Sequence, residues 1–241
     1  MNVLIIEDDP MIAKSLSLAL TDEGHHSNIC GTAEEGYIAS RDHFRDGSSS
    51  YDAIILDINL PDGDGIKLSK TLRSNKISTP VLVVSGRTST TDKVVALRSG
   101  ADGYLTKPFD RQELVANLTA IVRRYNGHTD SIIVTGPISL DLSTRSVTVN
   151  GDKIDLTGKE VQILELLSLR KGSIVTKSQI INHLYEGRDE PESKIIDVFV
   201  CKLRKKLATA SGGNNFIETV WGRGYVLRDQ ESEKVAEVSA A

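Results

Sequence analysis

The sequence predicts two domains: an α/β domain built on a five-stranded, doubly wound parallel sheet, followed by a smaller α+β domain. Short apolar runs alternate with helical patterns over residues 1–124, which is typical of a parallel sheet covered on both faces. The runs at 3–6 and 53–56 are uninterrupted, as in strands buried on both faces. After a polar linker at 125–131, apolar and polar residues alternate singly, which indicates an antiparallel sheet.

The elements of the first domain follow from these patterns. We expect strands at 3–6, 26–30, 53–57, 81–84 and 103–105. Helical patterns lie between them, at about 10–22, 33–44, 65–74, 91–99 and 110–124. Asp9 and Asp110 precede two of these helices and are expected to act as their N-caps.

The second domain is expected to span residues 132–228. Asn150-Gly151 within an alternating segment predicts a tight β-hairpin. Three helices should follow, at about 157–170, 176–186 and 192–209, and then a second hairpin over 216–227. The acidic tail at 229–241 is expected to be disordered, and its final Ala240-Ala241 resembles a bacterial protease tag.

The composition limits the class of protein. The 241 residues carry a net charge of −4, so no global basic field attracts nucleic acid. Residues 125–228 alone hold 14 basic against 12 acidic side chains, and 202–206 is a basic cluster, although such a cluster also fits a solvated helix face. The sequence has no apolar run of about 18 residues, and its two cysteines lie far apart. We therefore expect a cytoplasmic protein with no membrane span and no disulfide.

Carboxylates follow two of the predicted strands. Asp57 ends one apolar run, and Glu7 and Asp8 end another. If both strands are central, three carboxylates meet at one edge of the sheet, where a hard cation such as Mg²⁺ would balance their repulsion. Ser85 and Lys107 follow two further strands. A hydroxyl, an ammonium and a metal around one carboxylate form a site for a phosphoryl group in transfer.

These residues, in this order and spacing, resemble the receiver domain of response regulators, a flavodoxin-like fold. The resemblance covers residues 1–124 and implies that Asp57 accepts phosphate from a histidine kinase or a phosphotransfer protein. It implies a Mg²⁺ site made by Glu7, Asp8, Asp57 and the Asn59 carbonyl. It also implies phosphoryl binding by Ser85 and Lys107, a switch role for Tyr104, and a cis bond before Pro108.

Two other interpretations compete with this one. Each residue alone has an ordinary structural role: an Asp before a Pro-Asp-Gly turn is often a turn former. A haloacid-dehalogenase-like phosphatase also uses a strand-end Asp as nucleophile, but it needs a second Asp two residues later. Asn59 stands at that position, so we expect no true enzyme, only self-catalysed phosphoryl transfer to Asp57 and slow autodephosphorylation.

The predicted helix at 192–209 has two contrasting faces. Apolar residues at helical spacing form a core stripe: Ile196, Val200, Leu203 and Leu207. A different face carries Lys194, Val198, Lys202 and Lys205. A basic stripe opposite an apolar stripe suits a helix that lies in a DNA groove.

The order of sheet, three helices and hairpin, with the segments 194–207 and 219–225, resembles the winged helix-turn-helix domain of OmpR/PhoB-type regulators. The run 189–207 is most similar to the CtrA-like cell-cycle regulators of alphaproteobacteria. The resemblance implies DNA contacts by Lys194, Ile195, Val198, Lys202, Arg204 and, in the hairpin, Arg223. Asp197 is expected to pair with a basic neighbour instead.

Receivers of this type dimerise through a charged face, on which Lys93, Asp102, Glu113 and Asn117 would lie here. Gly103 and Asn117 replace both members of one expected Asp–Arg pair, so we expect a homodimer face that is kept but rewired, with more apolar or alternative contacts. The expected function is phosphorylation-controlled binding to promoter DNA, with RNA polymerase as a possible partner. The alternatives are a regulator that binds DNA independently of phosphate and a receiver that acts mainly as a protein-interaction module.

Overall fold

The structure is a computed structural model that describes residues 1–42, 51–185 and 192–229. The chain divides into two compact units, residues 1–125 and 126–241. The expected tail, including Ala240-Ala241, lies outside the described residues from position 230 onward, as does the segment 189–191. Among the described residues, no helix combines the length and the apolar character needed to cross a membrane.

The first unit contains the predicted five-stranded parallel sheet. Its strands are β1 Asn2–Ile6, β2 His26–Cys30, β3 Ala53–Leu56, β6 Val81–Ser85 and β7 Gly103–Thr106. They are arranged in the order β2-β1-β3-β6-β7, so the central strands are β1, β3 and β6. Every residue of β3 and β6 is buried, which explains their uninterrupted apolar runs. A short hairpin of β4 Asn59–Leu60 and β5 Gly63–Asp64 follows β3.

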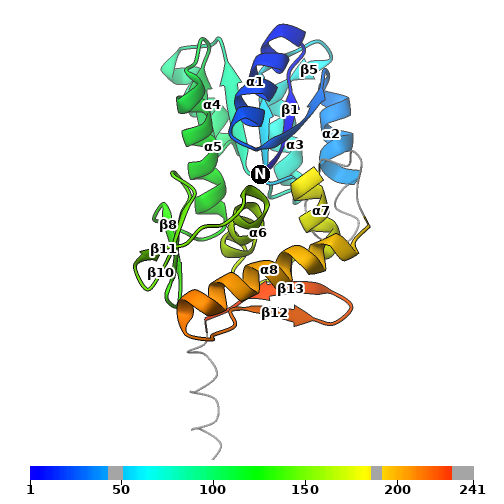
Figure 1. The fold of residues 1–241 in the computed structure, drawn as a ribbon. Helices are drawn as coiled ribbons and strands as arrows, with labels where there is room; N and C mark the ends of the chain where they lie inside the picture. Colours follow the sequence, from blue (N-terminus) through cyan, green and yellow to red (C-terminus); the bar gives the residue numbers. More distant parts are fainter. Residues whose placement is uncertain (43–50, 186–191, 230–241) are drawn as a thin grey trace, which may run out of the picture. The chain divides into compact units, whose positions relative to one another are not determined.

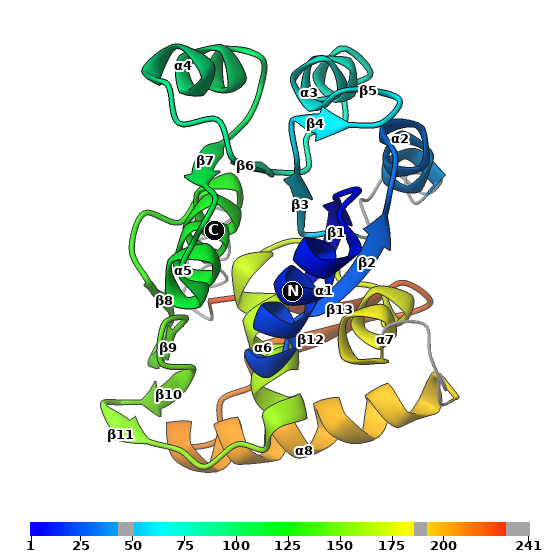
Figure 2. The same cartoon turned by 90° about the horizontal axis from the view of Figure 1, so that it is seen from above.

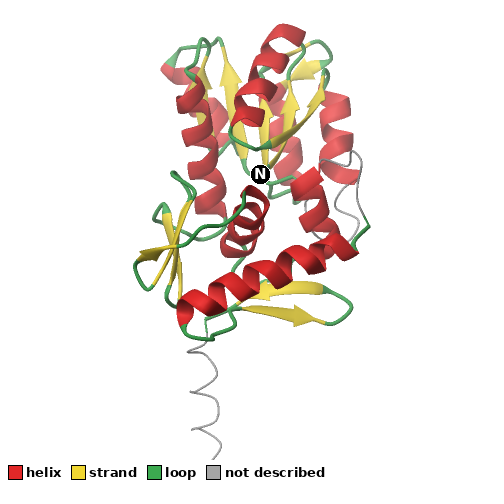
Figure 3. Ribbon diagram, in the orientation of Figure 1, coloured by secondary structure: helices red, strands yellow, loops and turns green. Residues whose placement is uncertain are grey.

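Helices cover both faces of this sheet (Figures 1 and 3). They are α1 Pro10–Asp22, α2 Ala33–Asp42, α3 Gly65–Ser74, α4 Thr90–Arg98 and α5 Arg111–Tyr125. In Figure 2, α2, α3 and α4 lie on one side of the sheet, and α1 and α5 lie on the other. Asp9 and Asp110 accept hydrogen bonds from the first amides of α1 and α5, which confirms both predicted caps. The expected end of the second helix, at 44, lies outside the described residues.

The described residues of the second unit form an antiparallel sheet, three helices and a hairpin. The sheet has the order β11-β10-β9-β8, with β8 Ile132–Thr135, β9 Ile138–Asp141, β10 Ser146–Val149 and β11 Asp152–Lys153. The helices are α6 Gly158–Leu169, α7 Lys177–Tyr185 and α8 Lys194–Ser211. The hairpin pairs β12 Ile217–Val220 with β13 Gly224–Leu227. Asn150 and Gly151 both have positive φ, as the predicted tight turn between β10 and β11 requires.

The core of the second unit is formed where α8 packs on the other helices and the hairpin. The predicted stripe of α8 is fully buried: Ile196, Val200, Leu203 and Leu207. The helix begins two residues later than expected and continues to Ser211, because Gly212 supplies the left-handed C-cap. Burial of this one stripe fixes which face of α8 remains exposed.

Candidate functional site

Four neighbouring strands deliver the predicted pocket residues to one edge of the parallel sheet. Glu7, Asp57 and Lys107 directly follow β1, β3 and β7, and Ser85 is the last residue of β6. Their backbones continue the strand ladder: Asp57 N donates to Ile6 O at 2.9 Å, and Lys107 N donates to Ser85 O at 2.8 Å. The backbone of the sheet therefore fixes the positions from which these side chains extend.

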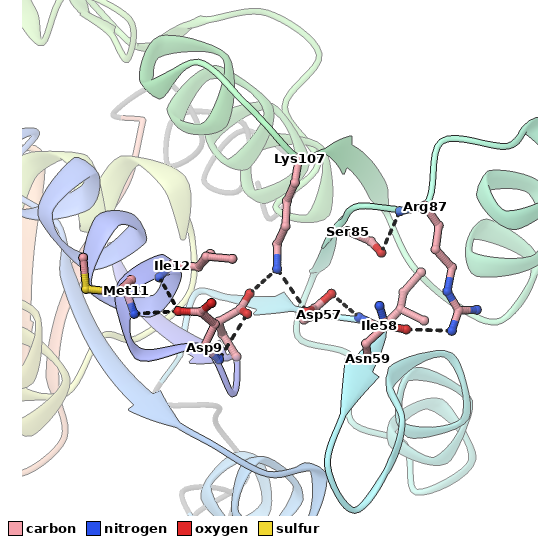
Figure 4. A network of polar contacts seen from close by, with 10 residues as sticks. Asp9, Met11, Ile12, Asp57, Ile58, Asn59, Ser85, Arg87 and Lys107 are labelled. Carbon is pink, nitrogen blue, oxygen red and sulfur yellow. Dashed lines mark hydrogen bonds and ion pairs between the residues drawn. The ribbon is translucent and has the colours of Figure 1, made fainter.

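The Lys107 ammonium connects two carboxylates across the pocket. Its Nζ lies 2.6 Å from Glu7 Oε2 and 3.0 Å from Asp57 Oδ2, and Figure 4 shows it pointing toward Asp57. Asp57 Oδ1 accepts a hydrogen bond from the Ile58 amide at 2.7 Å. The bond between Lys107 and Pro108 is cis, as predicted. Asp57 thus presents both oxygens to positively polarised groups in a buried position.

Three carboxylates crowd together at this edge. Glu7, Asp8 and Asp57 each offer an oxygen within 4.8 Å of the others; Glu7 and Asp57 are buried, whereas Asp8 is exposed. Burial raises the pKa of Glu7, and the nearby charge of Asp57 adds to the rise despite the hydrogen bond from Lys107. Burial alone would lower the pKa of Lys107, but its hydrogen bonds to Glu7 and Asp57 outweigh that effect and raise it. Within the described part of the chain, the pocket carries three acidic groups against one ammonium.

Ser85 and Tyr104 both contact the loop that follows β6. Ser85 is fully buried, and its Oγ accepts a hydrogen bond from Arg87 N at 3.3 Å. The half-buried Tyr104 donates from its hydroxyl to Arg87 O at 2.7 Å. Asn59 is exposed in β4, and its Oδ1 accepts a hydrogen bond from Arg87 Nη2 at 2.7 Å (Figure 4). Sequence reasoning missed Arg87, and the only signal was its place two residues after Ser85.

Position 65, eight residues after Asp57, has room only for a glycine. It is the first residue of α3, and a Cβ there would come 2.0 Å from the carbonyl oxygen of Asp57. That neighbour is backbone and cannot move without moving the acidic residue itself. Asp64 caps α3 by accepting from Ile66 N at 2.8 Å. The loop after β3 is therefore folded tightly under the pocket.

The exposed face of α8 is the predicted basic face. Lys194, Val198, Lys202 and Lys205 are all exposed, whereas Ile195 is only half-exposed. Arg223 is exposed in the turn between β12 and β13. Trp221 beside it is 90% exposed, and sequence reasoning did not single it out. A basic helix face and a cationic hairpin tip are the two parts that groove-binding domains use on DNA.

Two residues of α8 bind the hairpin. Arg204 Nε donates to Ile217 O at 2.7 Å, and its Nη2 donates to Thr219 Oγ1 at 2.8 Å. Asp197 pairs with the Lys177 ammonium at 2.7 Å and accepts a hydrogen bond from the Tyr225 hydroxyl. The bonds from Lys177 and Tyr225 hold the pKa of Asp197 below its ordinary value. Asp197 does pair with a basic neighbour, and the nitrogens of Arg204 are directed to β12.

The predicted dimer-face residues lie on α4, on α5 and directly before β7, but several already have partners within the receiver. Asp102 Oδ2 lies 2.8 Å from Arg73 Nη2 and accepts a hydrogen bond from Val81 N. Asn117 Nδ2 donates to the backbone oxygen of Glu113. Lys93 Nζ lies 6.0 Å from the centroid of the Tyr104 ring. Three apolar side chains of α4 are exposed by 39, 44 and 47%: Val94, Val95 and Leu97.

Family models match both units of the chain. Residues 3–119 match the response regulator receiver domain, and residues 151–227 match the C-terminal domain of transcriptional regulatory proteins. Together these are the two domains of OmpR/PhoB-type regulators. The first family is a regulatory receiver and the second is the output domain of transcriptional regulatory proteins, so the two together describe a regulator rather than a class of enzyme.

Relatives at the level of whole chains are also found. The cell cycle response regulator CtrA of Brucella anthropi is 51% identical over 233 residues, which cover 97% of this chain and 98% of that protein. The chain belongs to the CtrA-like response regulators. The CtrA of Brucella ovis has the same identity and coverage. This CtrA-like regulator is thus a two-component response regulator with receiver and DNA-binding domains, consistent with phosphorylation-dependent regulation of transcription.

Solved structures are similar to this CtrA-like regulator as well. The Thermotoga maritima response regulator DrrB, an OmpR/PhoB homologue, is 23% identical, with a TM-score of 0.43 over 94% of this chain and 98% of that one. The receiver domain of the Francisella response regulator 1452 is 33% identical, with a TM-score of 0.46 over 51% of this chain and 97% of that one.

Proposed function

We propose that Asp57 is the phosphoacceptor of this regulator. The observation that carries the proposal is the Lys107 bridge, which holds the buried Asp57 carboxylate in a fixed position beside Glu7. One Asp57 oxygen would attack the phosphorus of a phosphohistidine on the kinase or phosphotransfer protein. The P–N bond breaks, its electron pair returns to the imidazole, and an acyl phosphate forms on Asp57.

The donor set fits a Mg²⁺ ion. Glu7, Asp8 and Asp57 supply only oxygen ligands, the type that Mg²⁺ prefers, and the Asn59 carbonyl is a proposed further ligand. Burial, with the charge of Asp57 added, raises the pKa of Glu7, and a bound cation would compensate both effects. When bound, the ion would neutralise charge on the transferring phosphoryl group.

Ser85 and Lys107 are the proposed phosphoryl-binding residues. Both come from neighbouring strand ends, so a hydroxyl and an ammonium reach the oxygens of the same group. Phosphorylation replaces the single charge of the Asp57 carboxylate with a phosphoryl group of about −1.5 to −2 charge, which attracts both side chains. Tyr104 is hydrogen-bonded to the loop after Ser85 and is expected to change position with that loop.

The proposed consequence is a dimer that binds promoter DNA. The exposed apolar residues of α4 favour a face that is more apolar than the charged pairs usual in the family. Lys93, Asp102, Glu113 and Asn117 would lie at or beside this face. Two copies would place two α8 helices and two hairpins on paired half-sites. The proposed DNA contacts are Lys194, Ile195, Val198, Lys202 and Arg223, with RNA polymerase as a further candidate partner in the cytoplasm. Arg204, which the family resemblance also places at DNA, is proposed to act by holding β12.

Labelling with acetyl phosphate tests the phosphoacceptor. We expect the wild type to be labelled. Asp57→Asn and Asp57→Ala should lose labelling entirely, because they remove the proposed acceptor; among the described residues, Glu7 is the only other carboxylate that contacts Lys107. Asp62→Asn is the matched control, since Asp62 is exposed and bonded to the α2 amides of Ala33 and Glu34. Labelling that persists in Asp57→Asn would place the phosphate elsewhere. Intact-protein mass spectrometry measures the added phosphate.

A further inference from the structure

Arg87 connects the phosphoacceptor pocket to the start of α4. Its guanidinium donates to Asn59 Oδ1 at 2.7 Å and lies 3.9 Å from Asp92 Oδ1. Its backbone nitrogen donates to Ser85 Oγ, and its backbone oxygen accepts from the Tyr104 hydroxyl. Figure 4 shows Lys107 pointing toward Asp57 and Arg87 pointing toward Asn59. One residue therefore contacts two predicted pocket residues, the switch aromatic and α4.

The charge of Arg87 is only weakly compensated in this arrangement. Its short hydrogen bond goes to a neutral amide, Asn59, and the carboxylate of Asp92 lies at 3.9 Å, beyond hydrogen-bonding distance. The Arg87 side chain is 40% exposed, so packing constrains it only weakly. A guanidinium matches phosphate in geometry and can donate two parallel hydrogen bonds. A phosphoryl dianion on Asp57, two residues before Asn59, would therefore bind the guanidinium more strongly than Asn59 and Asp92 do.

We propose that Arg87 is a further phosphoryl-binding residue that couples the pocket to α4. When Asp57 is phosphorylated, the guanidinium exchanges Asn59 and Asp92 for phosphoryl oxygens. This inference rests on the proposed function, because it requires a phosphoryl group on Asp57. No covalent step involves Arg87; it changes only its hydrogen bonds and its ion pair.

The consequence for α4 follows from the place of Asp92. Asp92 lies in the first turn of α4, where its amide donates to the Ser89 cap at 3.0 Å and its carboxylate accepts from Ser89 Oγ at 2.5 Å. Departure of Arg87 leaves this turn without its cation. The same movement displaces the loop that binds the Tyr104 hydroxyl. The first turn of α4 thus becomes sensitive to phosphate, and the exposed apolar residues follow within the same helix.

Beryllofluoride, a non-covalent mimic of the phosphoryl group, tests the inference on the full-length protein with Mg²⁺. We expect Arg87→Ala to weaken beryllofluoride binding by about fivefold or more, and Arg87→Lys to lose less because it keeps the charge. Arg98→Ala is the matched control, since Arg98 is exposed at the opposite end of α4. Asp92→Asn should tighten binding, because it removes the competitor for the guanidinium. Titration calorimetry gives the affinities.

Hydrogen–deuterium exchange distinguishes a relay from a simple ligand. In the wild type, beryllofluoride should change exchange across residues 90–93, and in Arg87→Ala that change should be absent. Equal affinity of Arg87→Ala and Arg98→Ala for beryllofluoride would overturn the inference. A wild type that neither binds beryllofluoride nor accepts acetyl phosphate would instead overturn the proposed function itself. If the wild type is labelled at Asp57 and Arg87→Ala behaves like the wild type, only the proposed role of Arg87 is rejected.

Discussion

Glu160 is a buried carboxylate that joins two helices of the DNA-binding domain. It lies in the first turn of α6, where its Oε2 accepts a hydrogen bond from Thr157 N at 2.7 Å. The same oxygen lies 2.7 Å from Lys206 Nζ of α8. Burial alone would raise the pKa of Glu160, but the hydrogen bonds from Lys206 and Thr157 outweigh it and lower the pKa. The ionised side chain therefore stabilises the fold.

Glu160→Gln should lower the free energy of unfolding by about 1 kcal/mol at pH 7, because the amide keeps the bond from Thr157 but loses the charge opposite the partly exposed Lys206. Because the pKa of Glu160 is lower in the folded state, the ionised side chain stabilises the fold at pH values above its ordinary pKa of 4.5. This stabilisation is lost as the pH falls through the pKa of the folded state. The difference between variant and wild type should therefore shrink in acid. Urea unfolding, monitored by hydrogen exchange of the α6 amides, measures this difference in unfolding free energy.

The neighbouring lysines provide the control for this residue pair. Lys206→Gln should resemble Glu160→Gln, and the double variant should lose less than the sum of the two. Lys205→Gln removes an exposed charge one residue away and should change stability little. A pH-independent loss in Glu160→Gln would contradict the ion pair and point to packing alone.

At the same scale, the sequence predicted residues that follow strands better than residues that act through side-chain contacts. Glu7, Asp57 and Lys107 could be placed because the carboxyl ends of neighbouring parallel strands meet at one edge. Arg87 could not, because its bond to Asn59 joins two loops whose paths no sequence pattern specifies.

At the scale of elements, the predicted order of strands and helices is confirmed, and most boundaries differ by one or two residues. Periodicity locates a helix, but its ends depend on caps, such as Gly212 after α8. The hairpin of β4 and β5 was expected only as a turn, because two-residue strands leave no alternating pattern. The attachment of the terminal hairpin to α8 was not predicted, since it depends on which way Arg204 points.

This attachment predicts different DNA-binding defects for two residues of α8. Lys202 is exposed, so Lys202→Ala should weaken binding and reduce the slope of log affinity against log salt by about 1, as loss of one phosphate contact does. Arg204 holds β12, so Arg204→Ala should weaken binding while the slope stays unchanged. Fluorescence anisotropy on a bound promoter fragment over a salt series measures both quantities.

Lys153→Ala is the control for this comparison, because Lys153 is exposed on β11, in a sheet separate from the hairpin of β12 and β13. It should leave both affinity and slope near the wild-type values. A slope reduced in Arg204→Ala as much as in Lys202→Ala would show that Arg204 is itself a phosphate contact, as the family resemblance implies.

At the scale of the whole molecule, regulation requires that phosphate on one domain alters DNA binding by the other. The proposed route is association of two chains. Asp102 is paired with Arg73 inside the receiver, and Asn117 bonds within its own helix. One charge expected at such a face is therefore already paired within the receiver. The exposed apolar residues of α4 are a further source of association energy.

Leu97→Asp should prevent this association. Leu97 is 47% exposed on α4, and a carboxylate buried there between two chains would lack a partner, which should weaken the dimer by at least about tenfold. Sedimentation velocity at micromolar concentration, with Mg²⁺ and beryllofluoride, should show a wild-type dimer and a Leu97→Asp monomer. Leu18→Asp on α1 is the matched control, since Leu18 is 50% exposed. If the wild type itself stays monomeric while it binds beryllofluoride, phosphate must control DNA binding without a dimer.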